Sequence, residues 1–299
     1  MEIPTDGQSK SIESIEEVHA KSGLELEQEQ TERLLAYRLE NSKKLNSEVL
    51  LPYYEGNLTL EEIKEHLGLT NEQTKIVGFM LDSFKSPKSP DKAKRKDGSY
   101  IAVHSLQLFM TARDFFQIQG QDLLDILLVH DIAEDTQASL QDIAEKLGAH
   151  TSELASAMTE QRGEEQSDDP LARKRDIVIF ADQIKRAGPV VTSAEMIDRM
   201  DDISDLAYLL DKLPKADELA KEKIKDKLLT KFGKCAYTIQ KAEEATDVDG
   251  KRLAQQFHAL LRRQLSSIDS LYGVTIAEAD LQEEVASYQR LEEELLKKK

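Results

Sequence analysis

The chain has 299 residues, of which 39% are hydrophobic and 32% are charged, with 13 Gly, 7 Pro and no Trp. This composition is typical of a soluble, helix-rich globular protein with a real core, and it excludes a collagenous or low-complexity chain. The net charge of −17, from 40 basic and 57 acidic residues, argues against a general role in coating DNA or RNA.

Neither the cysteine content nor the N-terminus indicates export. Cys235 is the single cysteine, so the chain forms no intramolecular disulfide and no zinc-thiolate cluster. Residues 1–23 lack the basic start and apolar run of a secretory signal, and they are too acidic for a transit peptide. No stretch fits a membrane span. We therefore predict a cytoplasmic protein that does not bind membranes.

Helical periodicity dominates the chain, and no alternating apolar run bounded by turns argues for a sheet, so we predict an all-α fold. Residues 1–20 are polar and acidic, and 22–50 carry leucines among Glu and Gln, which is typical of an exposed helix. Thr59 and Thr70 each precede a helix, and Thr70 with Gln73 predicts a capping box. This pair has the outline of a DNA-reading helix-turn-helix, but its acidic flanks argue against DNA binding.

The segment 85–96 reverses the charge of the chain, with five lysines, one arginine and the single acid Asp91. One explanation is a solvated, proline-broken loop. The other is a local basic path for a phosphate-rich substrate, which an acidic protein would need. The position of the segment directly before the motifs described below favours the second explanation.

Strongly apolar helices are predicted between 100 and 142, with a turn at Gly120, and a further helix ends at Gly148. Residues 161–170 are polar and predict a loop. Later helices are predicted over 171–187, 192–213 and 215–299, the last with a break near 247–250. A final apolar stripe either packs on its own domain or pairs two copies of the chain. The stripe consists of Leu281, Val285, Tyr288, Leu291 and Leu295.

The sharpest signal is HDIAED, at 130–135 within the apolar run LLDILLVHDIAED. Positions i and i+4 share one face of a helix, so His130 would stack over Glu134 and Asp131 over Asp135. Burying these carboxylates without partners would be costly, and a divalent cation would remove that cost. The motif therefore predicts a metal site.

Further ligands would come from neighbouring helices. His104 lies on the apolar face of YIAVHSLQLF, and Asp198 lies in the core-helix sequence EMIDRMDDISDLAYLL. A lone histidine on an apolar face is more often a buried core residue than a ligand. The presence of HDIAED favours a ligand at His104.

In order and spacing, these motifs resemble the HD superfamily of metal-dependent phosphohydrolases. Within it they resemble the RelA/SpoT-type hydrolases of guanosine tetraphosphate (ppGpp), including small stand-alone hydrolases. RKDGSYIAVH at 95–104 is similar to RKSGEPYIIH, LLVHDIAEDT to LLHDVVEDT, and MIDRMDDISDL to LADRLHNMRTL. ARKRDIVIF at 172–180 is similar to a basic helix of the family. The resemblance implies an HD-domain helical bundle over 72–240, with helical extensions at 1–71 and 241–299.

The resemblance also implies a metal centre. Its four ligands to one ion would be His104, His130, Asp131 and Asp198. The ion in this family is usually Mn²⁺, which suits mixed imidazole and carboxylate ligation, and another divalent metal is the alternative. Glu134 and Asp135 match the acidic pair implicated in catalysis. Their task would be to orient and deprotonate the attacking water and to handle the proton of the leaving group.

The resemblance implies substrate contacts as well. Arg95 and Lys96 match residues that meet the nucleotide, where an arginine stacks on a base or holds phosphate in a planar fork. Arg173, Lys174 and Arg175 would receive the far pyrophosphate, with a solvated basic face as the alternative.

This chain departs from the family after Asp198. Asp202 stands where the family has Asn, and Ser204 and Asp205 replace the following Arg and Thr. A carboxylate accepts hydrogen bonds but does not donate them, and it repels phosphate. Asp201 adds further negative charge. Asp202 would therefore accept from a ribose hydroxyl, or the pocket would take another nucleotide, or activity would be reduced.

The predicted function is Mn²⁺-dependent hydrolysis of guanosine tetra- or pentaphosphate to GDP or GTP and pyrophosphate. One alternative is an HD phosphohydrolase that acts on another nucleotide. An alternative of a different class is a regulatory protein that binds nucleotide or metal without turnover. The predicted partners are a nucleotide substrate and a second copy of the chain through the terminal helices, with no nucleic acid.

Overall fold

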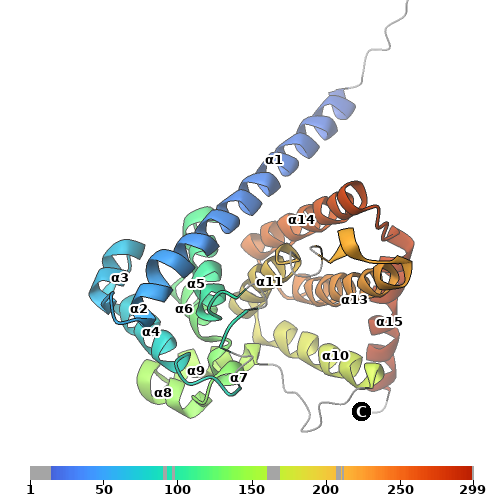
Figure 1. Cartoon of the computed structure of the whole chain (residues 1–299). Helices are drawn as coiled ribbons and strands as arrows, with labels where there is room; N and C mark the ends of the chain where they lie inside the picture. Colours follow the sequence, from blue (N-terminus) through green and yellow to red (C-terminus); the bar gives the residue numbers. More distant parts are fainter. Residues whose placement is uncertain are drawn as a thin grey trace, which may run out of the picture.

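The computed structural model describes residues 15–89, 93–95, 98–159, 169–206, 210 and 212–297, with side chains from residue 27 onward. Within these ranges the chain is built from helices and contains no named β-strand, so the predicted all-α fold is confirmed (Figure 1). None of the helices in the described part combines the length and the apolar character needed to cross a bilayer.

The first helices carry the chain from its N-terminal arm to the centre. In order they are α1 Ile15–Lys44, the π-helical η1 Leu45–Leu50, α2 Leu51–Tyr54, α3 Leu60–Leu67, α4 Asn71–Ser83, α5 Ala102–Met110 and the π-helical η3 Thr111–Phe115. Thr59 and Thr70 cap α3 and α4, each through a capping box, and the box predicted at Thr70 is confirmed. Gly68 ends α3 in the left-handed region, with φ of 61°, where glycine is unstrained.

The remaining helices form the second half of the molecule. They are α6 Gln121–Val129, α7 Ile132–Asp135, α8 Leu140–Leu147, α9 Ala149–Met158, α10 Pro170–Ala187, α11 Pro189–Ser204, the 3₁₀ turn η4 Leu213–Lys215, α13 Glu218–Glu243, α14 Val248–Tyr272 and α15 Glu278–Leu296. Figure 1 shows α5, α6 and α11 in the middle, α8 and α9 on one side, and α10, α13 and α15 on the other.

Two predicted helix ends need correction. The helix predicted over 192–213 begins earlier and stops at Ser204. Asp205 leaves the helical backbone with φ −89° and ψ 71°, and its carboxylate pairs with Arg95. The C-terminal region breaks as predicted before α14, but it breaks a second time at Gly273, which adopts φ of 62°.

HDIAED is not one continuous helix, as the i to i+4 reasoning assumed. His130 ends α6 and Asp131 opens α7, with a turn between the two helices. Adjacent side chains on an uninterrupted helix point about 100° apart. The turn instead allows His130 and Asp131 to face the same site.

The larger of two hydrophobic clusters among the described residues contains residues from all three predicted segments. It includes Leu34 of α1, Leu127 of α6 and Phe257 of α14. The apolar stripe of α15 packs within the chain, since Tyr288 is fully buried and stacks on Tyr237 of α13 with 5.1 Å between ring centroids. This is the first of the two alternatives that the sequence left open.

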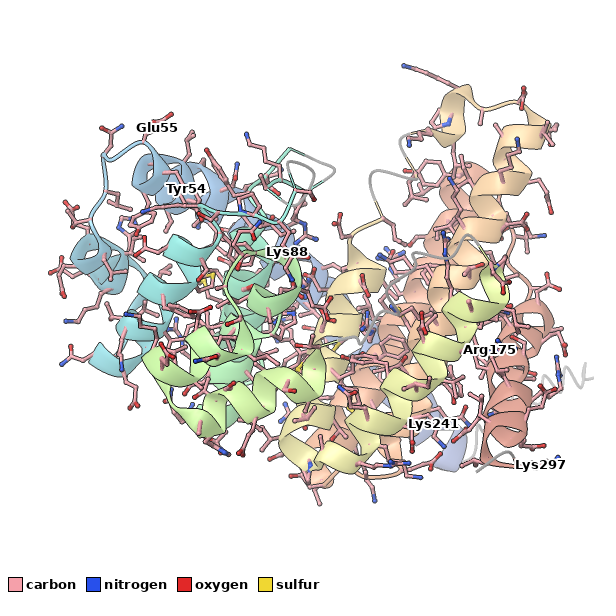
Figure 2. All side chains as sticks on the ribbon, turned by 90° about the horizontal axis from the view of Figure 1, so that it is seen from below. Tyr54, Glu55, Lys88, Arg175, Lys241 and Lys297 are labelled. Carbon is pink, nitrogen blue, oxygen red and sulfur yellow. The ribbon has the colours of Figure 1, made fainter. Side chains whose placement is uncertain are left out.

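The basic segment after α4 runs beside α7. The Lys88 amide donates to the Asp135 carbonyl at 2.9 Å, and Pro87 forms an isolated bridge with Thr136. Figure 2 shows Lys88 here and Arg175 on α10, well separated from each other. The described part of the segment thus lies next to HDIAED in space as well as in sequence.

Candidate metal centre

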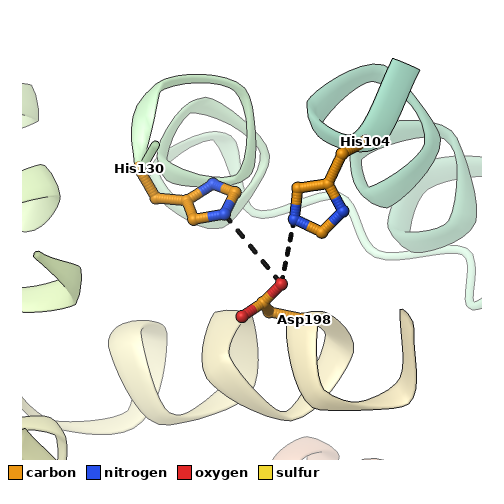
Figure 3. Close-up of side chains that lie close together, drawn as sticks. All are labelled: His104, His130 and Asp198. Atoms are coloured by element: carbon orange, nitrogen blue, oxygen red, sulfur yellow. Dashed lines mark ion pairs between the residues drawn. The ribbon is translucent and has the colours of Figure 1, made fainter. Parts of the chain in front are cut away.

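Three core helices bring the candidate ligands together. His104 lies in the first turn of α5, His130 directly follows α6, and Asp198 lies in α11. Both imidazole rings point at the same carboxylate oxygen of Asp198 (Figure 3). Each helix packs its apolar residues into the core, so the three positions are fixed by packing rather than by loops.

The spacing of these side chains suits a shared ion. Oδ1 of Asp198 lies 3.0 Å from Nε2 of His104 and 4.0 Å from Nε2 of His130. One ligand atom from each residue lies within 4.8 Å of the other two. Atoms bound about 2.1 Å from a first-row metal ion lie about 3 to 4 Å apart. Nε2 of His130 is buried without a hydrogen-bond partner among the described residues, and a buried nitrogen of this kind suits a metal ligand.

Asp131, the fourth predicted ligand, reaches the same space. Its Oδ1 lies 3.3 Å from Nε2 of His130, and its Oδ2 lies 3.5 Å from Nε2 of His104. The structure therefore brings all four predicted ligand residues together. Two imidazoles and two carboxylates are a donor set that fits a divalent first-row metal.

The opposite nitrogen of each ring is occupied. Nδ1 of His104 lies 2.8 Å from Oδ2 of Asp201, and Nδ1 of His130 lies 3.2 Å from the Leu127 carbonyl. Such contacts fix ring orientation and leave Nε2 for the metal, as in most protein metal sites. Arg199 places Nη2 3.6 Å from the second oxygen of Asp198.

The site is strongly polarised. Burial lowers the pKa of His130, but the charges of Asp131, Asp198 and Glu134 outweigh burial and raise it to about 10. Burial raises the pKa of Asp198, but Arg199, His104 and His130 outweigh it and hold that pKa well below its usual range. The carboxylates are thus ionised, and a nearby positive charge stabilises them. A bound cation would supply it and displace the histidine proton.

The predicted catalytic pair lies on α7, the short helix that follows Asp131. Glu134 is half-buried, and its charge acts on His130. Asp135 is buried, and its amide donates to the Asp131 carbonyl at 2.8 Å. Both carboxylates therefore come from the short helix that begins at a candidate ligand.

Arg95 also comes to the centre. Its Nη2 lies 2.6 Å from Oδ2 of Asp205 and 3.2 Å from Oδ2 of Asp201, the carboxylate that holds His104. The nucleotide contact predicted for Arg95 stays a prediction. Lys96 lies outside the described residues.

Asp202, one helical turn after Asp198 on α11, has two cationic partners. Arg199 pairs with one carboxylate oxygen, and Nζ of Lys231 lies 3.1 Å from the other. Burial raises the pKa of Asp202, but Lys231 and Arg199 outweigh burial and lower it to about 2. The repulsion of phosphate expected from this carboxylate is thus offset by two adjacent cations.

A basic cavity of about 810 Å³ adjoins Asp202, between α10, α13 and α15. Among the described residues, its basic lining consists of Arg173, Lys174, Lys212, Lys227, Lys231 and Lys234, and its acidic lining of Asp202, Asp226 and Glu284. Arg175 is exposed on α10 and is not among these lining residues (Figure 2). The structure thus brings Arg173 toward Asp202 but not Arg175.

Sequence reasoning missed the contacts of several residues at the centre and in the basic cavity. Asp201 is three positions after Asp198 on α11, so helical spacing alone indicates the shared face. Lys227, Lys231 and Lys234 are spaced i, i+4 and i+7 on α13, which also predicts one basic stripe. Arg38 of α1 pairs with Asp201 but is distant in sequence, and no local pattern indicates that contact.

Comparisons with protein-family models, curated proteins and solved structures give no match to this chain. The likeness to the HD superfamily therefore rests on the sequence motifs.

Proposed function

We propose that the chain is a metal-dependent phosphohydrolase that removes the 3′-pyrophosphate of guanosine tetra- or pentaphosphate and leaves GDP or GTP. The observation that carries the proposal is the convergence of His104, His130, Asp131 and Asp198 from separate core elements. The HD-type motifs supply the reaction class and the nucleotide. A cytoplasmic setting belongs to the proposal, and the buried, unpaired Cys235 is compatible with it.

The four converging residues would hold the ion, with Mn²⁺ as the proposed metal. A divalent ion held there would neutralise charge on the phosphoryl oxygens and make water a stronger nucleophile at neutral pH. Glu134 and Asp135 would orient the attacking water and accept its proton. Water attacks the phosphorus that is bonded to the ribose 3′ oxygen. The bond between this phosphorus and the 3′ oxygen breaks, and a carboxyl group donates a proton to the 3′ oxygen.

Two basic regions support a polyphosphate substrate in this acidic chain. The first is the segment at 85–89, which lies against α7 beside the candidate catalytic pair. The second is the basic cavity next to Asp202, one helical turn after Asp198. Positive charge beside a negatively charged metal centre favours binding of phosphate groups.

The test is product analysis on the purified full chain loaded with Mn²⁺. We expect release of pyrophosphate from guanosine tetraphosphate, and loss of that release with a chelator or in His130→Ala. The matched control is His150→Ala, which changes an exposed histidine on α9. A panel of other nucleotides is assayed in parallel for phosphate and pyrophosphate.

Each other outcome replaces the proposal with a stated alternative. Turnover of a different nucleotide alone rejects the alarmone but keeps the hydrolase. Nucleotide or metal binding without any turnover supports the regulatory protein. A folded chain that binds no divalent metal rejects the metal centre itself.

A further inference from the structure

We infer that Asp201 and Arg38 are positioning residues of the metal centre, so that helix α1 forms part of it. This inference rests on the proposed metal site. It assigns a role to the N-terminal extension, which the HD-like motifs do not cover. The chain of contacts runs from Arg38 through Asp201 to the candidate ligand His104.

The contact between Asp201 and His104 is the first step. Asp201 is 2% exposed, and its Oδ2 lies 2.8 Å from Nδ1 of His104. A carboxylate in this place accepts the Nδ1 hydrogen, which fixes both the ring orientation and the tautomer with a free Nε2. That Nε2 is the atom that faces Asp198. Asp201 therefore acts on the metal through His104 rather than by ligating it.

Arg38 supplies the second step. It lies on α1 and is 4% exposed, and its Nη2 pairs with Oδ1 of Asp201, the oxygen that faces away from His104. Among the described residues, its Nε and Nη1 have no hydrogen-bond partner. Among the described residues, Asp201 is thus the carboxylate in direct contact with this buried guanidinium, and the guanidinium in turn limits how the carboxylate can rotate.

Further contacts tie α1 to the helix that carries His104. The side-chain amide of Gln107, one turn after His104, donates to the Arg38 carbonyl at 2.9 Å. The Tyr37 hydroxyl donates to the Met110 carbonyl at 3.2 Å. Arg38 and His104 therefore lie on two helices that are hydrogen-bonded to each other, and these bonds fix the position of Arg38 relative to His104.

Arg95 adds a second cation to Asp201, with Nη2 3.2 Å from Oδ2. Substituting Arg38 by Met consequently leaves Asp201 with one cationic partner and retains most of the buried stem. Arg38→Met is therefore a milder perturbation than Asp201→Ala. It tests the contacts from Arg38 through Asp201 to His104 without leaving a buried carboxylate without a cationic partner.

The experiment measures the dissociation constant of Mn²⁺ by electron paramagnetic resonance on the full chain. Loss of an outer partner of a ligand typically weakens metal binding about 10- to 100-fold, and we expect this for Asp201→Ala. Asp201→Asn keeps an acceptor for Nδ1 and should restore part of the affinity. Arg38→Met should weaken binding in the natural chain but add little to Asp201→Asn, because it acts through the missing carboxylate.

Arg262→Met is the matched control. It removes an exposed ion pair between α14 and Glu27 of α1 and should leave Mn²⁺ affinity unchanged. Circular dichroism shows whether each variant is folded. If Asp201→Ala is unfolded, the Mn²⁺ affinities of Asp201→Asn and Arg38→Met test the inference.

Wild-type affinity in folded Asp201→Asn and Arg38→Met overturns the inference. If Arg38→Met lowers Mn²⁺ affinity equally in the natural chain and in Asp201→Asn, the role assigned to Arg38 is overturned. Absence of Mn²⁺ binding by the natural chain instead rejects the proposed function.

Discussion

Replacing Asp125 by Asn should stabilise the folded protein, and the gain should depend on pH. Asp125 lies on α6, the helix that His130 directly follows. It is 8% exposed, and the Gln121 side-chain amide is its hydrogen-bond donor. Burial raises its pKa from 3.8 to about 6, against the Gln121 hydrogen bond and with help from the charges of Glu72 and Asp122. The folded protein therefore holds a carboxylate that is less stable than it would be in water.

The linkage between protonation of Asp125 and folding sets the sign and size of its effect on the free energy of unfolding. Because the folded-state pKa is raised, the stability contributed by Asp125 is fully present below about pH 3.8 and is lost as the pH rises through about 6. The difference between 3.8 and about 6 corresponds to about 3 kcal/mol at pH 8. Asp125→Asn keeps the size of the side chain and cannot ionise. It should raise the free energy of unfolding by about 3 kcal/mol at pH 8 and by about 1 kcal/mol at pH 4.5.

Urea unfolding of both chains at the two pH values checks this prediction. Glu65→Gln on the exposed side of α3 is the control and should change the unfolding free energy little at either pH. An equal effect of Asp125→Asn at pH 4.5 and pH 8, or a loss of stability at pH 8, would show that burial does not control the pKa of this carboxyl.

Three further predictions concern the metal, the substrate and the core. Mn²⁺ at 100 times its dissociation constant should stabilise the chain by about 2.7 kcal/mol, seen as a higher melting temperature, and His130→Asn should abolish the shift. Lys234→Gln in the basic cavity should raise KM for the polyphosphate about tenfold at unchanged Mn²⁺ affinity, whereas Arg175→Gln outside the cavity lining should leave KM nearly unchanged. Phe109→Ala removes a fully buried ring of α5 and should lower the free energy of unfolding by about 3 to 5 kcal/mol; a loss below 1 kcal/mol would contradict that packing.

Features encoded locally were predictable from the sequence. The capping box at Thr70 follows from residue types three positions apart, and the all-α fold follows from helical periodicity. The candidate ligands His104, His130 and Asp198 could be named because polar groups interrupt apolar helical runs. The structure brings these three side chains within reach of one ion.

Features that depend on distant contacts were not predictable in this way. Helical periodicity continues past Ser204, yet α11 ends there and Asp205 pairs with Arg95 from another part of the chain. The turn between His130 and Asp131 is likewise hidden within a sequence that reads as one helix. The pairing of Arg38 with Asp201 needs the packing of α1 against the core, which no local pattern encodes.

Pulsed electron paramagnetic resonance of the Mn²⁺-loaded chain detects directly which side chains bind the ion. We expect one bound ion with nuclear modulation from two imidazole nitrogens, reduced to one in His104→Ala and in His130→Ala. An ion without nitrogen modulation, or one whose spectrum is unchanged by both substitutions, would contradict a centre held jointly by α5, α6 and α11.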